Sequence, residues 1–195
     1  MSNLDRPAGL KPIKNLNGSP WSGKANVYYI PVGNATNLFV GDAVQSTGTA
    51  DETGKYPGVE QADLNESIRG VIIGFGDNPN VMVHPDTPNR SYCPDSTEMY
   101  CWVVDDPFVI FEVQEDSDGG ALAVTAVGTT VDLVLTAGST TTGKSGMKLD
   151  SSDTGTDNQH CRLLRVVDRE DNALGTNCKW EVLISLHELL ATADV

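Results

Sequence analysis

One stretch of this sequence matches a phosphate-binding loop. Residues 138–145 read GSTTTGKS and fit the G-x-x-x-x-G-K-[ST] pattern, in which backbone amides and a lysine hold phosphate oxygens. That chemistry needs a helix to begin at the lysine, because the helix N-terminus directs its amides and its dipole at the phosphates. The residues that follow, GMKLDSSDTG, are too rich in Gly, Ser and Asp to sustain a helix. We therefore interpret the match as a coincidence within a Ser/Thr/Gly-rich loop.

Three acidic loops offer the oxygen ligands that calcium prefers, at residues 115–120, 150–157 and 168–172. None contains a twelve-residue loop closed by a bidentate Glu, so solvated turns explain them better. The histidines show no zinc-ligand spacing with the cysteines or carboxylates; they are His84, His160 and His187. The sequence predicts no metal and no cofactor.

Candidate nucleophiles have no recognisable base beside them. No serine lies in a G-x-S-x-G elbow, and no two of the four cysteines have the two-residue spacing of a redox or zinc motif; they are Cys93, Cys101, Cys161 and Cys178. Without an export signal, reduced thiols are the default, with a local bridge between Cys93 and Cys101 as the open alternative. Nothing in these patterns requires an enzyme, and we expect a protein that binds without catalysis.

Composition restricts the partners. The 195 residues carry 13 Lys and Arg against 27 Asp and Glu, a net charge of −14, with 39% apolar residues. That charge disfavours direct binding to DNA or RNA, and no apolar run is long enough for a membrane helix, so we expect a soluble globular protein. Residues 1–24 hold four basic residues against Asp5, a net charge of +3, which leaves −17 for residues 25–195. A basic arm thus precedes an acidic body.

The arm, residues 1–24, has three prolines and several glycines and shows neither helical nor strand periodicity. Such a segment is extended and becomes ordered by lying on another surface. That surface is either its own domain or a neighbouring subunit, and the sequence leaves both open. Its basic residues and spaced apolar side chains are the predicted partner-binding residues: Arg6, Leu10, Lys11, Lys14 and Trp21.

From residue 25 onward the chain is a series of short β-branched and aromatic runs separated by turn residues. The predicted strands are residues 27–32, 38–44, 68–75, 100–104, 108–114, 131–135, 161–167 and 180–186. Helical spacing is confined to residues 186–191 and 121–127. The pattern predicts an all-β fold, an antiparallel sandwich or barrel with long loops, as one domain over residues 25–195 with a loop insertion near residues 77–96.

Four stretches resemble a known family: NLDRPAGLKP at residues 3–12, LNGSPW at 16–21, FEVQEDSDGGAL at 111–122 and DNALGTN at 171–177. The resemblance is to tailed-bacteriophage virion structural proteins of the capsid decoration, or cement, type, and it covers nearly the whole chain. Because these motifs are turn and strand landmarks, the resemblance implies a role and no catalytic site.

The implied role is to bind the outer surface of the assembled phage head and bridge subunits of the major capsid protein, which stabilises the shell. An acidic body suits the outside of a head better than a lumen filled with DNA. Closed symmetry favours homotrimers, with homodimers as the alternative. Deleting residues 1–21 is then expected to leave the β-domain folded and to weaken attachment.

Two other classes of function fit the same composition. Another virion component, such as a tail-tube, spike or head-fibre subunit, would be equally β-rich, although no repeat is visible. A carbohydrate-binding β-module would use Trp102, Trp180 and several tyrosines as a stacking platform. Trp180 leads an alternating apolar strand, however, and is expected in the core.

Overall fold

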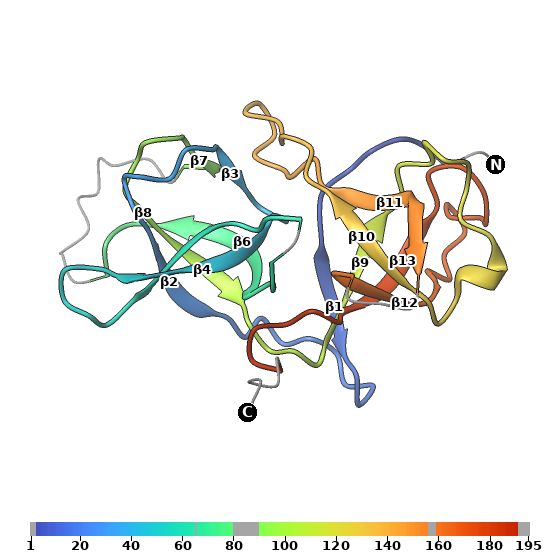
Figure 1. Ribbon diagram of the computed structural model, residues 1–195, viewed down its shortest axis with the longest axis horizontal. Coiled ribbons are helices and arrows are strands. Elements are labelled where there is room, and N and C mark those ends of the chain that lie inside the picture. The colour runs from blue at the N-terminus through green and yellow to red at the C-terminus, as the bar shows by residue number, and fades with distance from the viewer. Residues whose placement is uncertain (1–2, 65, 80–89, 156–158, 191–195) are drawn as a thin grey trace.

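The computed structural model describes residues 3–64, 66–79, 90–155 and 159–190. They form two β-units side by side, with β2 to β8 in one and β1 and β9 to β13 in the other (Figure 1). Within these residues the helical content is a single 3-10 turn, Val124–Ala126. The all-β prediction is confirmed.

The first unit is a closed barrel with strand order β2-β5-β4-β6-β8. Its strands are β2 (Asn26–Ile30), β4 (Ala43–Ala50), β5 (Pro57–Gln61), β6 (Gly70–Gly76) and β8 (Met99–Val104). All neighbours are antiparallel except β2 and β5, which meet in one parallel pairing that closes the barrel. Alternate residues fill the interior, as period-two side-chain alternation requires, and they include Tyr28, Ile30, Ile72, Cys101 and Val103. A short ladder of β3 (Leu38–Phe39) and β7 (Tyr92–Cys93) lies beside this unit.

The second unit is a six-stranded sheet with strand order β1-β9-β13-β12-β10-β11. Its strands are β1 (Lys11–Asn15), β9 (Val109–Gln114), β10 (Thr130–Val134), β11 (Lys148–Gly155), β12 (Cys161–Val166) and β13 (Lys179–Ile184). The sheet curls back on itself, because a parallel bridge joins Leu149 of β11 to Glu115 at the end of β9. Trp180, Val182 and Ile184 all face its core, as the alternation in the sequence predicts.

Three segments hold the two units together. The Leu10 amide donates to the Gly41 carbonyl at 2.9 Å, the Ser145 amide to the Val40 carbonyl at 2.9 Å, and the Ile68 amide to the Leu186 carbonyl at 2.8 Å. Barrel residues such as Ile68 and Val71 also belong to the apolar cluster of the sheet unit. The N-terminal arm, the loop before β11 and the segment after β13 therefore each cross from the sheet unit to the barrel.

The structure corrects several element predictions. The arm contains strand β1, residues 57–61 form β5 where no strand was predicted, and residues 150–155 of one predicted acidic loop belong to β11. The predicted strand 38–44 is broken at Gly41, because its φ of +98° is not that of a strand. Only glycine fits there, since a Cβ would overlap the Ala8 carbonyl oxygen. The helix expected at residues 186–191 is a bend and turn through residue 190, and Ala191 lies outside the described residues. The predicted insertion at residues 77–96 also falls in part outside them, at residues 80–89.

Candidate partner-binding groove

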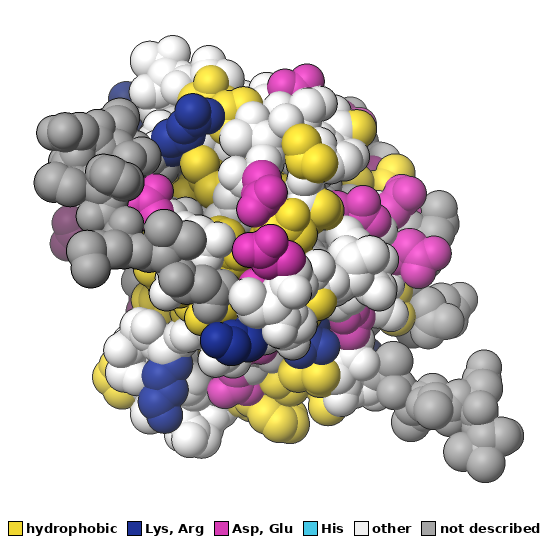
Figure 2. Space-filling view, turned by 90° about the vertical axis from the view of Figure 1, so that its left-hand side faces the viewer, with side chains coloured by type: hydrophobic (Ala, Val, Ile, Leu, Met, Phe, Trp, Pro, Cys, Tyr) yellow, Lys and Arg dark blue, Asp and Glu magenta, His cyan; other side chains and the backbone are white. Residues whose placement is uncertain are grey.

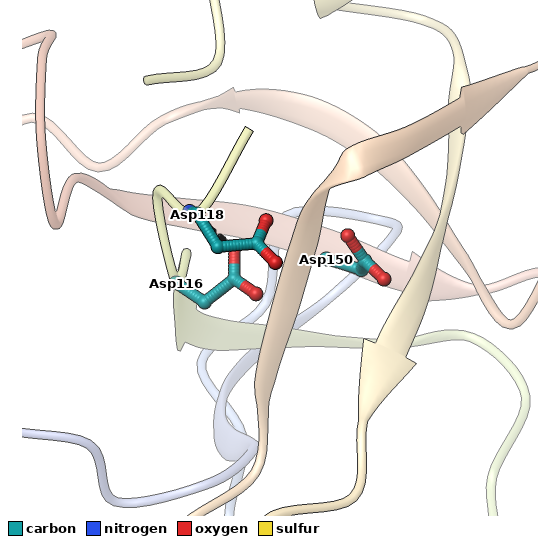
Figure 3. A group of neighbouring side chains, drawn as sticks. All are labelled: Asp116, Asp118 and Asp150. Carbon is teal, nitrogen blue, oxygen red and sulfur yellow. Dashed lines mark hydrogen bonds between the residues drawn. The ribbon is translucent and has the colours of Figure 1, made fainter. Parts of the chain in front are cut away.

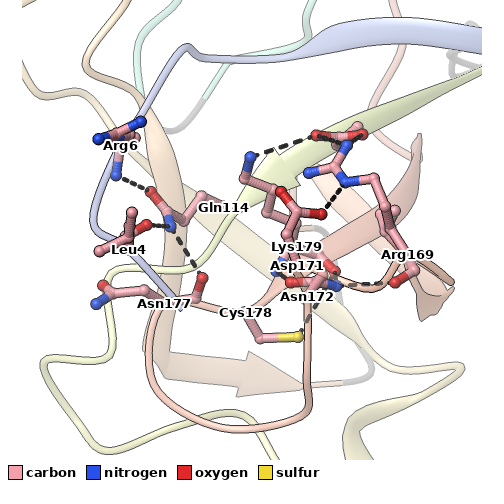
Figure 4. Close-up of polar contacts among 11 residues, drawn as sticks. Leu4, Arg6, Gln114, Arg169, Asp171, Asn172, Asn177, Cys178 and Lys179 are labelled. Atoms are coloured by element: carbon pink, nitrogen blue, oxygen red, sulfur yellow. Dashed lines mark hydrogen bonds and ion pairs between the residues drawn. The ribbon is translucent and has the colours of Figure 1, made fainter. Parts of the chain in front are cut away.

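A buried glutamine fixes the start of the N-terminal arm on its own chain. The Gln114 side chain, 3% exposed, accepts the Arg6 amide at 2.9 Å and donates to the carbonyls of Leu4 at 2.8 Å and Asn177 at 2.9 Å (Figure 4). It thereby contacts the arm backbone much as a neighbouring strand would. Asn3 adds hydrogen bonds to the backbone of Ala173 and Thr176. Of the two surfaces that the sequence left open for the arm, this structure uses the chain's own domain.

Further along, the arm crosses the barrel at a glycine pair. Gly9, with φ +65, lies against Gly41, and a Cβ on Gly9 would overlap the Gly41 carbonyl oxygen. This close approach needs glycine on both sides. It places the next side chain, Leu10, in the shared core with 1% of its surface exposed.

A groove of about 600 Å³ lies where the arm, the barrel and the sheet meet. The arm forms one wall, β6 and the β3–β4 turn form another, and the outer face of the sheet completes it. The lining residues are Arg6, Ala8, Leu10, Lys11, Pro12, Trp21, Val40, Gly41, Ile72, Ile73, Glu112, Lys144, Arg169 and Lys179. Four of the five partner-binding residues predicted from the sequence thus come together there: Arg6, Leu10, Lys11 and Trp21.

The fifth predicted residue, Lys14, does not line this groove. Its ammonium group lies 2.8 Å from the carboxylate of Glu181 on β13, which also pairs with Arg165 at 2.8 Å. Lys14 therefore ties β1 across β9 to β13. Its pairing within the chain argues against its use as a partner anchor.

The groove is cationic in an acidic protein. Five basic side chains line it against one acid, Glu112, a local balance of +4 where the whole chain has −14. Away from the groove, Asp and Glu side chains gather across the middle and right of the barrel end in Figure 2, with hydrophobic side chains between them. Five of the thirteen Lys and Arg residues of the sequence therefore line this one groove.

Two of these cations are held by the chain itself. Arg169 binds Glu112 at 3.1 Å and also Asp171, and the hydrogen bond from Arg169 lowers the pKa of Asp171 (Figure 4). Lys179 lies 3.7 Å from Glu112. In contrast, the exposed side chains of Arg6, Lys11 and Lys144 form no ion pair within the described residues. These three charges are available to a ligand.

The segment that matches the phosphate-binding pattern is built as a closed turn. The Gly143 amide donates to the Ser139 carbonyl at 2.7 Å, and the Ser139 amide to the Lys144 carbonyl at 2.9 Å. After Lys144 the chain runs through buried Ser145 and Met147 into β11, so a helix does not begin there. The Lys144 side chain instead lines the groove.

Beside this turn lies a buried carboxylate. Asp42, with none of its surface exposed, accepts the Phe39 amide on one carboxylate oxygen at 2.8 Å, and its other oxygen is buried without a hydrogen-bond partner among the described residues. Burial outweighs the Phe39 amide and the neighbouring Ser145 side chain and raises the pKa of Asp42 to about 6. This carboxylate lies where the barrel meets the sheet unit, and its charge changes near pH 6.

Three carboxylates from the predicted acidic loops meet at the end of the sheet. Asp116 and Asp118 follow β9, Asp150 lies on β11, and one oxygen of each lies within 4.8 Å of the others (Figure 3). Asp116 accepts the Ser151 amide at 3.0 Å, and Asp150 accepts the Ser152 amide at 2.9 Å. Both donors are backbone amides of β11, so contacts within the chain already account for these carboxylates and we assign no ion to the cluster.

The cysteines and tryptophans have structural positions. All four cysteines are free and buried, and burial raises the pKa of each thiol, to about 11 for Cys93 and Cys178. Trp180 is fully buried, whereas Trp102 is 42% exposed and lies over Gly76 on the outside of the barrel. The stacking platform that would combine these two tryptophans is therefore not formed.

Sequence reasoning missed three basic residues of the groove: Lys144, Arg169 and Lys179. Lys144 lies in the stretch that matches a phosphate-binding loop, but nothing local relates it, Arg169 or Lys179 to the arm, because all three lie more than 130 residues after Lys11 in the sequence. A scan of family models, a search of curated proteins and a search of solved structures each found no match to this chain. Among the described residues, no helix is long and apolar enough to span a membrane.

Proposed function

We propose that this protein is a phage capsid decoration protein that binds the outer surface of the head through the cationic groove and acts without chemistry. The observation that carries the proposal is the meeting of Arg6, Leu10, Lys11 and Trp21 in one groove. These residues belong to the stretches that resemble the cement family, so the resemblance and the candidate site coincide.

The construction of the molecule supports a bracing role. A shell brace must resist local unfolding under load, which favours dense β-pairing and few exposed backbone bonds. Two β-units joined by three crossing segments meet this need. Many copies that each bind weakly would together oppose the pressure of packed DNA.

The acidic surface also fits a position outside the head. With a net charge of −14 the protein would be repelled by packed DNA inside the lumen. The partner is then the major capsid protein, and closed symmetry favours a homotrimer at local threefold positions, with a homodimer at twofold positions as the alternative.

The test is cosedimentation of the purified protein with capsids that lack it, measured as copies bound per shell. Saturation at a symmetry-related number supports the proposal and distinguishes trimer from dimer sites. Failure to bind capsids, with association with tail fractions or retention on immobilised glycan instead, would contradict it. Deletion of residues 1–21 is not a clean control, contrary to the expectation from sequence, because it removes β1 and the buried Leu10.

A further inference from the structure

We propose that the cationic groove binds an extended acidic segment of the partner protein, with carboxylates on either side of a bulky apolar side chain. This inference rests on the proposed function, because it states what the capsid surface presents to that site. It concerns the chemistry of recognition rather than the fact of attachment.

Charge selects the acidic part of the segment. Arg6, Lys11 and Lys144 are exposed and lack ion pairs within the described residues, and they come from the arm and from the turn before β11. Cations on two walls of one groove attract carboxylates more strongly than the same charges spread over a surface. Arg169 and Lys179 add positive potential while remaining fixed to Glu112.

The floor of the groove selects the apolar part. Trp21 and Ile73 are half-buried and pack on the shared core, and Val40 and Pro12 are half-buried beside them. A bulky side chain laid on this floor removes apolar surface from water, at about 25 cal/mol for each Å². The volume of about 600 Å³ lies within the usual range for ligand sites.

A polypeptide fits this site better than a nucleic acid. Strand-tracking nucleic-acid sites combine positive charge with a series of aromatic stacking faces, whereas Trp21 is the one aromatic residue of the groove lining. The acidic surface elsewhere would also oppose the approach of a long phosphate backbone. A short acidic segment meets the groove without that repulsion.

The experiment measures fluorescence anisotropy of a labelled ten-residue peptide in which Glu flanks Leu and Phe, beside the same peptide with Gln for every Glu. The groove variant combines Arg6→Gln, Lys11→Gln and Lys144→Gln. The matched control combines Lys24→Gln, Lys55→Gln and Arg90→Gln, which removes the same charge at exposed positions outside the groove lining. Thermal unfolding of both proteins checks that they remain folded.

We expect the acidic peptide to bind the wild type in a salt-dependent manner, the groove variant to lose at least tenfold in affinity, and the control to stay within about twofold. Equal binding of the Gln peptide, or equal loss in the control, would overturn the inference. So would tighter binding of a DNA oligonucleotide of the same charge. Sedimentation that finds self-association lost only in the groove variant would assign the groove to a second copy instead and also overturn it.

The same variants separate this inference from the proposed function. A groove variant that fails with the peptide and on capsids, while the control saturates them, supports both. If the groove variant still saturates capsids, the groove inference fails and the proposed function stands. If the wild type binds the peptide but never binds capsids, the proposed function fails and the groove keeps its preference for acidic peptides.

Discussion

The barrel and the sheet unit are both all-β, but they are assembled differently. Residues 26–104 contain every strand of the barrel, and its apolar cluster comes from that stretch alone. The sheet unit combines residues 109–184 with β1 from the N-terminal arm, and its cluster includes Leu10. The barrel is therefore a local structure, whereas the sheet unit depends on a strand that lies about a hundred residues away in sequence.

Buried polar groups also differ between the two units in the sequence distance over which they form hydrogen bonds. In the barrel, buried Asp51 accepts the amides of Lys55 and Tyr56 and so fixes its own turn. In the sheet unit, fully buried Glu115 accepts the Leu122 amide and the indole of Trp180, and Gln114 holds the arm. Polar groups thus shape turns in one unit and join distant segments in the other. Loss of one such group should matter more in the sheet unit.

The largest expected effect is that of Trp180→Ala. The side chain is fully buried in the sheet unit, and its indole donates to Glu115 at 3.1 Å. Removal leaves a cavity and a buried carboxylate without that donor, and we expect the free energy of unfolding in urea to fall by about 3–5 kcal/mol. Phe75→Ala in the barrel, which leaves no polar group unpaired, should cost less. An equal or larger loss at Phe75 would break the comparison between the two units.

This division also explains what the sequence could predict. Seven of the eight predicted β-branched or aromatic runs each marked one strand, in the barrel and the centre of the sheet, because burial on such strands selects those residues. The eighth, residues 38–44, spans β3, a break at Gly41 and the start of β4. The strands that escaped notice have few apolar residues, and they include β1, which carries Pro12 where its register shifts, β5, which reads PGVEQ, and β11, which reads KLDSSDTG. The partner of β1, β9, lies about a hundred residues away in the sequence, whereas β5 and β11 pair with the strands directly before them, β4 and β10.

The candidate site could likewise be predicted only in part from the sequence. Residue types in the arm indicated Arg6, Lys11 and Trp21, because basic and spaced apolar residues in an extended segment are typical of docking. The cations opposite them could not be inferred, since Lys179 reaches the groove through the pairing of β13 with β9, and Arg169, between β12 and β13, through its ion pair with Glu112 on β9. Local sequence patterns thus predicted the residues of the arm, whereas the residues on the other walls are brought there by the tertiary fold.

The next effect concerns the joint between the units. Because the pKa of Asp42 is raised to about 6 in the folded protein from 3.8, the folded state binds the proton more tightly, so Asp42 lowers stability as pH rises from about 4 to 6. Each pH unit between the two pKa values is worth about 1.4 kcal/mol, which gives roughly 3 kcal/mol in all. Urea unfolding at pH 4 and pH 7 should therefore show the stability of Asp42→Asn, relative to wild type, rising by this order. If the difference in the free energy of unfolding between Asp42→Asn and wild type does not change with pH, Asp42 does not have the raised pKa. The same conclusion follows if exposed Asp95→Asn shows an equal change.

A smaller effect is expected when Gln114, the side chain that holds the N-terminal arm, is shortened. Gln114→Ala deletes the hydrogen bonds to Arg6, Leu4 and Asn177, and we expect a loss of about 2 kcal/mol. The loss should be local, because the amide of Arg6 is released while β13 remains paired to β9. Hydrogen exchange should accelerate at residues 4–11 and stay unchanged in the barrel. Faster exchange throughout the barrel would show that the arm supports both units equally.

The smallest expected effect is that of Lys14→Gln. Lys14 binds Glu181 at 2.8 Å, but Arg165 holds the same carboxylate at 2.8 Å, so the charge keeps a partner when the lysine is lost. Partly exposed ion pairs contribute little, and we expect less than about 1 kcal/mol in urea unfolding. Because Lys14 lies outside the groove lining, capsid binding should be unchanged while the groove variant loses it. A Lys14→Gln protein that folds normally but binds capsids as poorly as the groove variant would move the binding site from the groove to the outer face of the sheet.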